Sequence, residues 1–217
     1  REISEIGETA EAERMIEVND MAAVYKLGGR PHVVGPFVNV YNENTLKVLE
    51  RLGARTVCLP PELPAHSIGV IAAHRSTADI EVLAFGRAPL AVSARCYHAR
   101  IHELSKDGCR YVCENDPDGL EVDTLDGQRF LAINGIATMA NGVTVLGSEL
   151  SMLAKSGVSR IRLSPHTCDM VAVSAAYRDL LDARIDTAEF MSRIRQQPLP
   201  GSIVNGYIHG QAGGRVA

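Results

Sequence analysis

The fold is decided by the stretch Arg55-Thr-Val-Cys-Leu-Pro-Pro61 and the two segments that follow it, residues 65–74 and Asp79-Ile-Glu-Val-Leu-Ala84. Residues 55–59 have the composition of a buried strand, and the proline pair ends that strand. Residues 65–74 predict a helix, and residues 79–84 predict the next strand. Two strands joined by a helix in this way run parallel, with a right-handed crossover. We therefore predict an α/β protein built on a parallel sheet.

The same alternation of strand and helix extends to both sides of this stretch. The further predicted strands are residues 14–18, 31–35, 130–133 and 160–163, and the further predicted helices are residues 21–27, 45–52, 147–156 and 169–181. This pattern suits part of a (β/α)8 barrel or an open doubly wound sheet. The second alternative lacks the G-x-G-x-x-G motif that would follow a strand.

The composition of the chain is that of an ordinary globular domain, with 217 residues of which 46% are apolar and 22% charged. A formal net charge of −4, from 22 Lys and Arg against 26 Asp and Glu, gives no basic footprint for nucleic acid. No apolar run reaches the roughly 18 residues that span a bilayer. We expect a cytoplasmic protein with no nucleic-acid partner and no membrane span. The odd number of cysteines, five, suits thiols that stay free.

Three of the five cysteines lie within residues 93–113, where Cys96, Cys109 and Cys113 have the spacing C-x12-C-x3-C. Thiolates are the soft ligands of zinc and of iron–sulfur clusters, and a short spacing lets two sulfurs reach one centre. Three thiolates leave such a centre one ligand short. The alternative is three incidental thiols in a long loop, because a lone C-x3-C is a weak motif.

Several motifs carry a resemblance that covers nearly the whole chain. They are Pro89-Leu-Ala-Val-Ser-Ala-Arg-Cys96, Cys109-x3-Cys113, Phe130-Leu-Ala-Ile-Asn-Gly-Ile-Ala-Thr-Met139 and Arg162-Leu-Ser-Pro165, with Tyr41-Asn42, Thr45-Leu46-Lys47 and Asn205-Gly206-Tyr207. Together they resemble the collagenase-like peptidase family, type U-32, and within it the members that act in ubiquinone biosynthesis.

The resemblance implies a (β/α) barrel of TIM type, incomplete because its amino-terminal strands are absent. It also implies a [4Fe-4S] cluster held by four cysteines. Cys96, Cys109 and Cys113 match three of these, and the fourth is expected in the missing amino-terminal segment. Cys58 and Cys168 match no ligand position, and we expect neither to hold the cluster.

The function implied by the resemblance is oxygen-independent ubiquinone biosynthesis. The protein would form a heterodimer with a UbiU-like sister subunit and support hydroxylation of the quinone precursor ring. It would do so as an accessory or electron-transfer subunit, and the sequence leaves open whether it is itself an enzyme.

Two alternatives come from other functional classes. A peptidase of the same family is weakened because Phe85 and Pro89 stand where peptidase-like members have a histidine and a cysteine, and because G-x-S-x-G and H-E-x-x-H are absent from the sequence. A zinc-stabilised binding module would use His98 and His102, which are four residues apart and close to Cys96. The resemblance places no ligand at either histidine.

Polar residues also follow several predicted strands, at the places where barrel enzymes carry their functional side chains. They are Asn39, Asn42, Glu62, Asn134, Ser164 and His166, with Glu81 inside a strand. Each one alone suits a cap or a turn, whereas together they predict a lined pocket.

The start of the chain at Arg1, with polar sequence of helical character over residues 2–9, leads us to expect the carboxy-terminal part of a longer protein. We predict a partial barrel domain over residues 1–197, which includes an inserted cysteine loop at residues 89–129. Residues 198–217 are rich in Pro and Gly. We expect residues 210–217 to be a mobile tail unless they pack against a partner.

Overall fold

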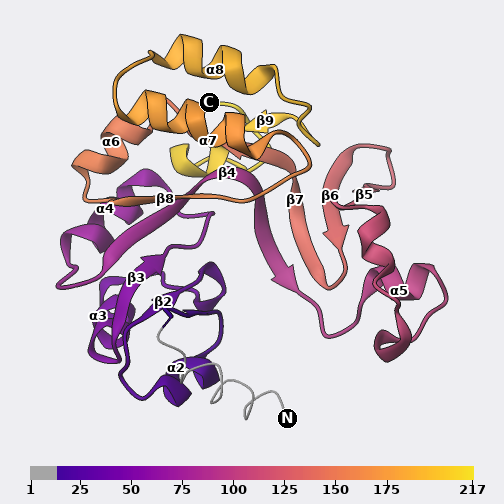
Figure 1. Cartoon of the computed structure of the whole chain (residues 1–217), viewed down its shortest axis with the longest axis horizontal. Coiled ribbons are helices and arrows are strands. Elements are labelled where there is room, and N and C mark those ends of the chain that lie inside the picture. Colours follow the sequence, from indigo (N-terminus) through magenta and orange to yellow (C-terminus); the bar gives the residue numbers. More distant parts are fainter. Residues whose placement is uncertain (1–13) are drawn as a thin grey trace. The chain divides into compact units, whose positions relative to one another are not determined.

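The computed structural model describes residues 14–217, apart from the side chain of Lys106. The polar helical sequence at residues 2–9 lies outside the described residues. The chain forms two compact units, each made of segments that are distant in the sequence (Figure 1). Unit 1 holds the residues up to 83 together with residues 149–162 and 207–210. Unit 2 holds residues 84–148, 163–206 and 211–217.

Unit 1 contains the predicted parallel sheet. Its strands are β1 (Glu17–Val18), β2 (His32–Val34), β3 (Ala54–Cys58) and the first part of β4 (Asp79–Val92), each parallel to its neighbour. The helices α2 (Met21–Leu27), α3 (Glu43–Arg51) and α4 (Ala65–Ala73) connect them. The α/β class is therefore confirmed, although β1 is shorter than the strand predicted at residues 14–18.

Two helices of unit 1, α2 and α3, begin at capping residues of the sequence. The Asp20 side chain accepts a hydrogen bond from the Ala23 amide at the start of α2, and Asn42 accepts one from Thr45 at the start of α3. Gly28 has φ 57° and ends α2 in the left-handed conformation that glycine adopts without steric cost. These local signals explain why the predicted helices lie close to the observed ones.

The sheet of unit 1 is curled. β8 (Arg160–Leu163) pairs with β4, so four neighbour-to-neighbour steps separate it from β1. In a flat sheet these steps amount to about 19 Å, which an arginine and a glutamate side chain together do not span. Nevertheless, Arg162 Nη1 on β8 lies 3.1 Å from Glu17 Oε1 on β1. The two outer strands therefore face each other, which is consistent with an incomplete barrel.

Unit 2 is built on antiparallel pairing. β4 pairs with β7 (Ala137–Val145), β7 with β6 (Arg129–Asn134), and β6 with β5 (Leu120–Asp123). The short strand β9 (Ile203–Val204) runs parallel to β7. The strand predicted at residues 130–133 is confirmed, but it lies in the antiparallel part of the sheet rather than in the parallel part. These residues belong to β6, because the turn at Asn134-Gly135 returns the chain into β7, a strand that we did not predict.

β4 continues to Val92, whereas the sequence predicted its end at residue 84. Gly86 and Pro89, residue types that usually interrupt a strand, lie inside it. Gly86 has φ 113°, and a Cβ there would lie 2.6 Å from the Cβ of Ser164, so glycine is needed for this close approach. Pro89 lies at a register shift of the β4–β7 pairing, where proline is tolerated. Glycine and proline therefore distort the strand without ending it.

Two helices contribute to the core of unit 2, α7 (Met170–Leu181) and α8 (Thr187–Arg195). Tyr177 of α7 and Phe190 of α8 pack edge to face with their ring centroids 4.7 Å apart. The buried Tyr177 hydroxyl donates to the Ala84 carbonyl at 2.6 Å, so the polar atom in this core is satisfied. α7 confirms the helix predicted at residues 169–181, whereas α8 was not predicted.

The remaining elements are short. α6 (Leu150–Lys155) lies within the helix predicted at residues 147–156, and the 3-10 turns η1 (Pro36–Val38) and η4 (Gly206–His209) flank longer elements. Near the end of the chain, the Asn205 amide donates to the Arg215 carbonyl, and the Asn205 side chain accepts from the Ala217 amide. Arg215 and Ala217, within the predicted mobile tail, are thus hydrogen-bonded to Asn205 in the same unit.

Candidate functional site

The three clustered cysteines lie in one part of unit 2, the cysteine segment (residues 89–129). Cys96 is the N-cap of α5 (Tyr97–Ile101), where its sulfur accepts a hydrogen bond from the Ala99 amide at 3.4 Å. Cys109 ends the 3-10 turn η2 (Lys106–Gly108), and Cys113 lies inside η3 (Val112–Asn115). All three thiols are free and half-buried.

His98 is the buried centre of this segment, with only 1% of its surface exposed. The Gly135 amide donates to His98 Nδ1 at 3.1 Å, and His98 Nε2 lies 3.1 Å from Asp116 Oδ2. Because a backbone amide can only donate, Nδ1 is the acceptor, and Nε2 carries the proton that is donated to Asp116. Both ring nitrogens are therefore engaged, and neither has a lone pair for a zinc ion in this arrangement. His102, the other histidine considered for zinc, is exposed at the end of α5.

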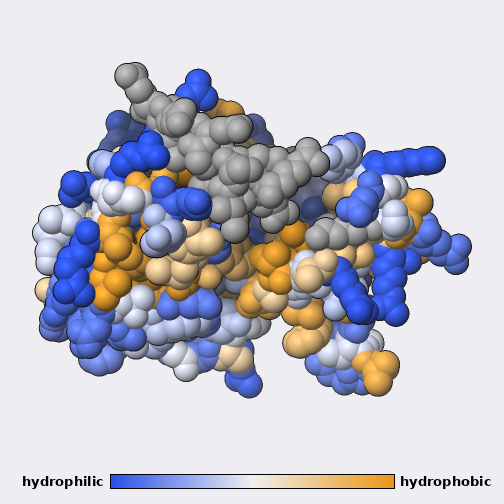
Figure 2. Space-filling view, turned by 90° about the horizontal axis from the view of Figure 1, so that it is seen from below, coloured by the Kyte–Doolittle hydropathy of each residue, from blue (hydrophilic) through white to orange (hydrophobic). Residues whose placement is uncertain are grey.

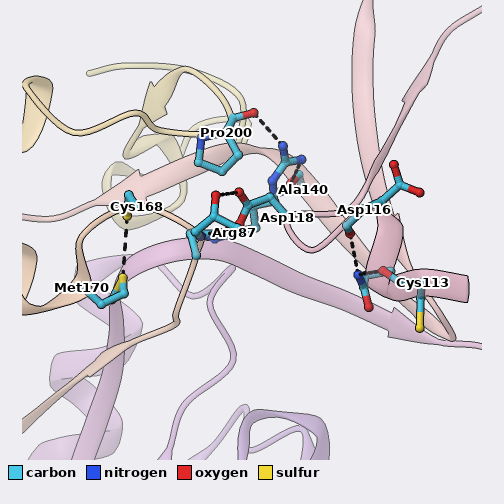
Figure 3. A network of polar contacts seen from close by, with 11 residues as sticks. Arg87, Cys113, Asp116, Asp118, Ala140, Cys168, Met170 and Pro200 are labelled. Carbon is cyan, nitrogen blue, oxygen red and sulfur yellow. Dashed lines mark hydrogen bonds and ion pairs between the residues drawn. The ribbon is translucent and has the colours of Figure 1, made fainter. Parts of the chain in front are cut away.

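The turn between β6 and β7 holds the other end of the segment. The Asn134 side-chain amide donates to the Cys113 carbonyl at 3.2 Å and to the Asp116 carbonyl at 2.7 Å (Figure 3). Gly135, with φ 58°, lies beside the Cys113 side chain, and a Cβ at Gly135 would lie 3.7 Å from the Cys113 sulfur. The turn therefore fixes the backbone of η3 directly at a candidate ligand.

The backbone around Cys109 is less regular. Glu103, Arg110 and Tyr111 have φ values of 55°, 50° and 55°, in the left-handed region that non-glycine residues seldom adopt. The other non-glycine residues with positive φ in the described part of the chain are Asn39 and Ala183. Strained backbone is therefore concentrated in the part of the segment that carries Cys109.

A second polar network in unit 2 joins the residues after β8 to the end of the cysteine segment. His166 Nδ1 lies 3.0 Å from Asp118 Oδ1, and the Arg87 amide donates to His166 Nε2 at 3.1 Å. The Thr167 amide and hydroxyl also donate to Asp118. Burial alone would raise the pKa of Asp118, but the hydrogen bonds from Thr167 and His166 outweigh it and lower that pKa. Burial lowers the pKa of His166, which favours the neutral form of its ring.

Arg87 extends this network into the interior of unit 2. Its guanidinium donates to the Pro200 carbonyl at 2.7 Å and to the Ala140 carbonyl at 3.4 Å (Figure 3). The residue is 3% exposed, and its Nε has no hydrogen-bond partner among the described residues. Burial lowers the pKa of Arg87. The side chain ties β4 to the segment before β9 by bonds to neutral carbonyl groups.

Unit 1 contains a third polar group, on the inner face of its curled sheet. Arg162 donates to Glu81 Oε1 at 2.6 Å and to both carboxylate oxygens of Glu17. Burial alone would lower the pKa of Arg162, but its bonds to Glu17 and Glu81 outweigh it and raise that pKa. Cys58 is buried beside this group, and burial raises the pKa of its thiol well above the ordinary range. The burial therefore disfavours the thiolate form that a metal ligand requires.

The other predicted pocket residues have local roles. Asn42 caps α3, Asn39 ends η1 in the left-handed conformation, and Ser164 packs against Gly86. Glu62 accepts a hydrogen bond from the Tyr41 hydroxyl, which raises the pKa of Tyr41 to about 12. Cys168 is buried next to Met170, with the two sulfurs 3.7 Å apart. Some of these residues belong to unit 1 and others to unit 2. The contacts of each are those of a cap, turn or packing residue.

The sequence reasoning missed Asp116 and Asp118. Both belong to the run Asn115-Asp-Pro-Asp-Gly119, which also has the composition of a tight turn. No local signal separates them from ordinary turn residues, because their histidine partners lie 18 and 48 residues away in the chain.

The cysteine segment offers the type of ligand that an iron–sulfur cluster uses, because it contains three free, half-buried thiols. It is one thiolate short of four. Within residues 14–217, no group of three or more His, Cys, Asp or Glu side chains is arranged to hold a metal ion, so the three thiols share one segment but are not gathered around one centre.

The sequence model of peptidase family U32 matches residues 15–216, which is nearly all of the described chain. The chain belongs to peptidase family U32. No solved structure matches this U32 chain. In its described part, no helix is both long enough and apolar enough to cross a bilayer.

Proposed function

We propose that this U32-family chain is a UbiV-like iron–sulfur protein of oxygen-independent ubiquinone biosynthesis, built on an incomplete barrel of TIM type. Cys96, Cys109 and Cys113 would supply three thiolates to a [4Fe-4S] cluster, and the fourth would come from an amino-terminal segment of a longer protein. The observation that carries the proposal is that all three thiols are free and half-buried within one segment of unit 2.

The chemistry of the segment supports this assignment. Half-buried thiols remain within reach of an incoming metal, whereas Cys58 and Cys168 are buried and burial raises the pKa of both. A bound [4Fe-4S] cluster with four cysteine ligands supplies one-electron transfer, which suits an accessory role in hydroxylation of a quinone precursor. The chain's own contribution is to hold the ligands in place and to limit solvent around them.

A UbiU-like sister subunit is the partner that we propose, in a heterodimer. The cysteine segment exposes several large apolar side chains, among them Tyr111 and Leu125, and Phe130 next to it is also exposed. Figure 2 shows apolar residues between charged ones on the face that it displays. A contact surface for the sister subunit requires exposed apolar side chains, and these residues supply some of them. Co-purification of both full-length proteins under anaerobic conditions tests this, and recovery of a lone monomer with the sister protein present would contradict it.

The peptidase and the zinc-stabilised module remain the competing functions. For the peptidase, Phe85 stands where peptidase-like members have a histidine, and it is buried against Tyr177 and His166. For the zinc module, both nitrogens of His98 are already engaged. Metal content separates the three functions cheaply.

The experiment is anaerobic purification of the full-length protein, followed by measurement of iron, acid-labile sulfide, zinc and visible absorption. Iron with sulfide is the expected result. Single Cys→Ser variants at Cys96, Cys109 and Cys113 should lose iron, whereas Cys58→Ser and Cys168→Ser should keep it at a cost of about 1 kcal/mol of stability. Full iron retention in Cys109→Ser, stoichiometric zinc, or a metal-free protein that cleaves denatured collagen would overturn the proposal.

A further inference from the structure

The candidate ligands Cys96 and Cys113 lie on two different arms of the cysteine segment. Cys96 begins α5, and Cys113 lies in η3. His98, two residues after Cys96, is hydrogen-bonded to Asp116, three residues after Cys113. This one side-chain contact therefore joins the two arms close to both sulfurs.

The β6–β7 turn fixes this contact from a third side. The Gly135 amide selects the tautomer of His98 that donates to Asp116, and the Asn134 side chain holds the carbonyl groups of Cys113 and Asp116. We call these four residues, His98, Asp116, Asn134 and Gly135, the histidine clamp. The bonds of the clamp do not involve Cys109, whose neighbours Arg110 and Tyr111 have positive φ.

We propose that the histidine clamp holds Cys96 and Cys113 in place before iron binds, and that His98 is a positioning residue rather than a ligand. This inference rests on the proposed iron–sulfur function. Ordering the two arms that carry Cys96 and Cys113 costs conformational entropy. With the clamp in place this entropy is lost when the chain folds, so it no longer opposes metal binding. Cys109 then completes the set from the part of the segment outside the clamp.

The two nitrogens of His98 can be replaced separately. In His98→Asn, the side-chain oxygen can accept from the Gly135 amide near the former Nδ1, but the donor to Asp116 is lost. In His98→Gln, the side-chain amide can donate to Asp116, but the acceptor for Gly135 is lost. His98→Phe removes both bonds while it keeps a ring in the buried site. His102→Phe is the matched control, because His102 is exposed four residues later in the same segment.

The first measurement does not depend on iron. Hydrogen exchange of the Gly135 amide in the metal-free, full-length protein should be slow in the wild type and in His102→Phe. It should be fast in His98→Phe and His98→Gln, and His98→Asn should restore protection. Unchanged exchange in His98→Phe would show that the clamp does not exist in solution.

The second measurement is iron release to a chelator under anaerobic conditions, followed by the visible spectrum. Removal of supporting contacts of this kind typically weakens metal binding about 10- to 100-fold, so His98→Phe should release iron faster by a similar factor. His98→Gln and His98→Asn should fall between it and the wild type, with an unchanged spectrum when loaded. Iron release from His98→Phe as slow as from His102→Phe would overturn the positioning role, and an altered spectrum in the two milder variants would mean that His98 is a ligand. A wild-type protein without iron would instead overturn the proposed function, and this role with it.

Discussion

Arg162 on β8 donates hydrogen bonds to Glu17 on β1, although three other strands lie between these two in the sheet of unit 1. The contact requires the sheet to curl until its outer strands face each other. Glu81 on β4 binds the same guanidinium, so one cation serves two carboxylates on the inner face. The Arg162 side chain therefore links three strands of unit 1, β8, β4 and β1.

Arg162→Met should lower the free energy of unfolding by about 2 kcal/mol, because Glu17 and Glu81 would lose their shared cation in a partly buried site. The matched control is Arg160→Met on the same strand. Arg160 pairs with Asp79 and has a side chain that is 55% exposed, compared with 27% for Arg162. Its loss should cost less than about 1 kcal/mol. Urea denaturation followed by circular dichroism measures both, and equal losses would contradict the role of Arg162 in the curled sheet.

The stability that Glu50 contributes to the protein should be lost in acid. Its Oε1 accepts from the amides of residues 76, 77 and 78 at 2.7, 2.7 and 2.9 Å. Burial alone would raise the pKa of Glu50, but these amides outweigh it and lower the pKa below its ordinary value of 4.5. The stability that the carboxylate contributes is therefore complete above pH 4.5, and it is lost as the pH falls through the lower folded-state pKa.

Glu50→Gln should accordingly flatten the acid side of the stability profile while it costs about 1 kcal/mol at neutral pH. Urea midpoints between pH 3 and pH 7 provide the measurement. Asp123→Asn, which changes an exposed carboxylate on β5, is the control and should leave the profile as it is. An identical acid slope in Glu50→Gln and the wild type would rule out this linkage.

His166 should contribute a second, separate pH dependence. Burial lowers the pKa of His166 from its ordinary value of 6.5, so the unfolded chain binds the proton more tightly than the folded protein. Stability from this site is complete above pH 6.5 and is lost as the pH falls through the lower folded-state pKa. His166→Gln should remove that dependence, whereas the same change at the exposed His66 should not. Unfolding midpoints between pH 5 and pH 8 would decide, and a slope that persists in His166→Gln would assign it to another group.

Tyr111→Gly should stabilise the protein by about 0.5–1 kcal/mol, because glycine adopts the positive φ of this residue without steric cost. Tyr111 is 72% exposed, so little packing is lost. Tyr97→Gly at the start of α5, where no left-handed conformation is present, should be destabilising and serves as the contrast. Thermal unfolding of the metal-free protein measures both changes. A destabilised Tyr111→Gly would mean that its backbone is not strained in solution.

The parts of the fold that the sequence predicted well are those with local signals. α2, α3 and β8 follow capping residues and short apolar runs, and their bounds lie within a few residues of the prediction. In the antiparallel part of the sheet, β6 was predicted, whereas β7 and the second half of β4 were missed because these strands contain turn-like residues. Gly86 and Pro89 lie inside β4, and Asn141-Gly142 lies inside β7, where strand pairing overrides the local preference.

In the candidate site, too, local features could be predicted from the sequence and long-range contacts could not. The spacing of the cysteines suggested a metal centre, and the family resemblance supplied the ligands that we propose; both come from the sequence alone. The partners of His98 lie 18 and 37 residues away in the chain, so its engagement by Asp116 and Gly135 appears only in three dimensions. The same distance hid the bond between His166 and Asp118, which are 48 residues apart.

The histidine clamp also bears on the order in which the chain assembles. Closing a loop costs entropy that grows with the logarithm of its length. The contact between His98 and Asp116 closes 18 residues, whereas the contact between Arg162 and Glu17 closes 145. The longer closure costs about 1.8 kcal/mol more. A growing or refolding chain therefore meets a lower entropic barrier in forming the cysteine segment than in bringing the outer strands of unit 1 together.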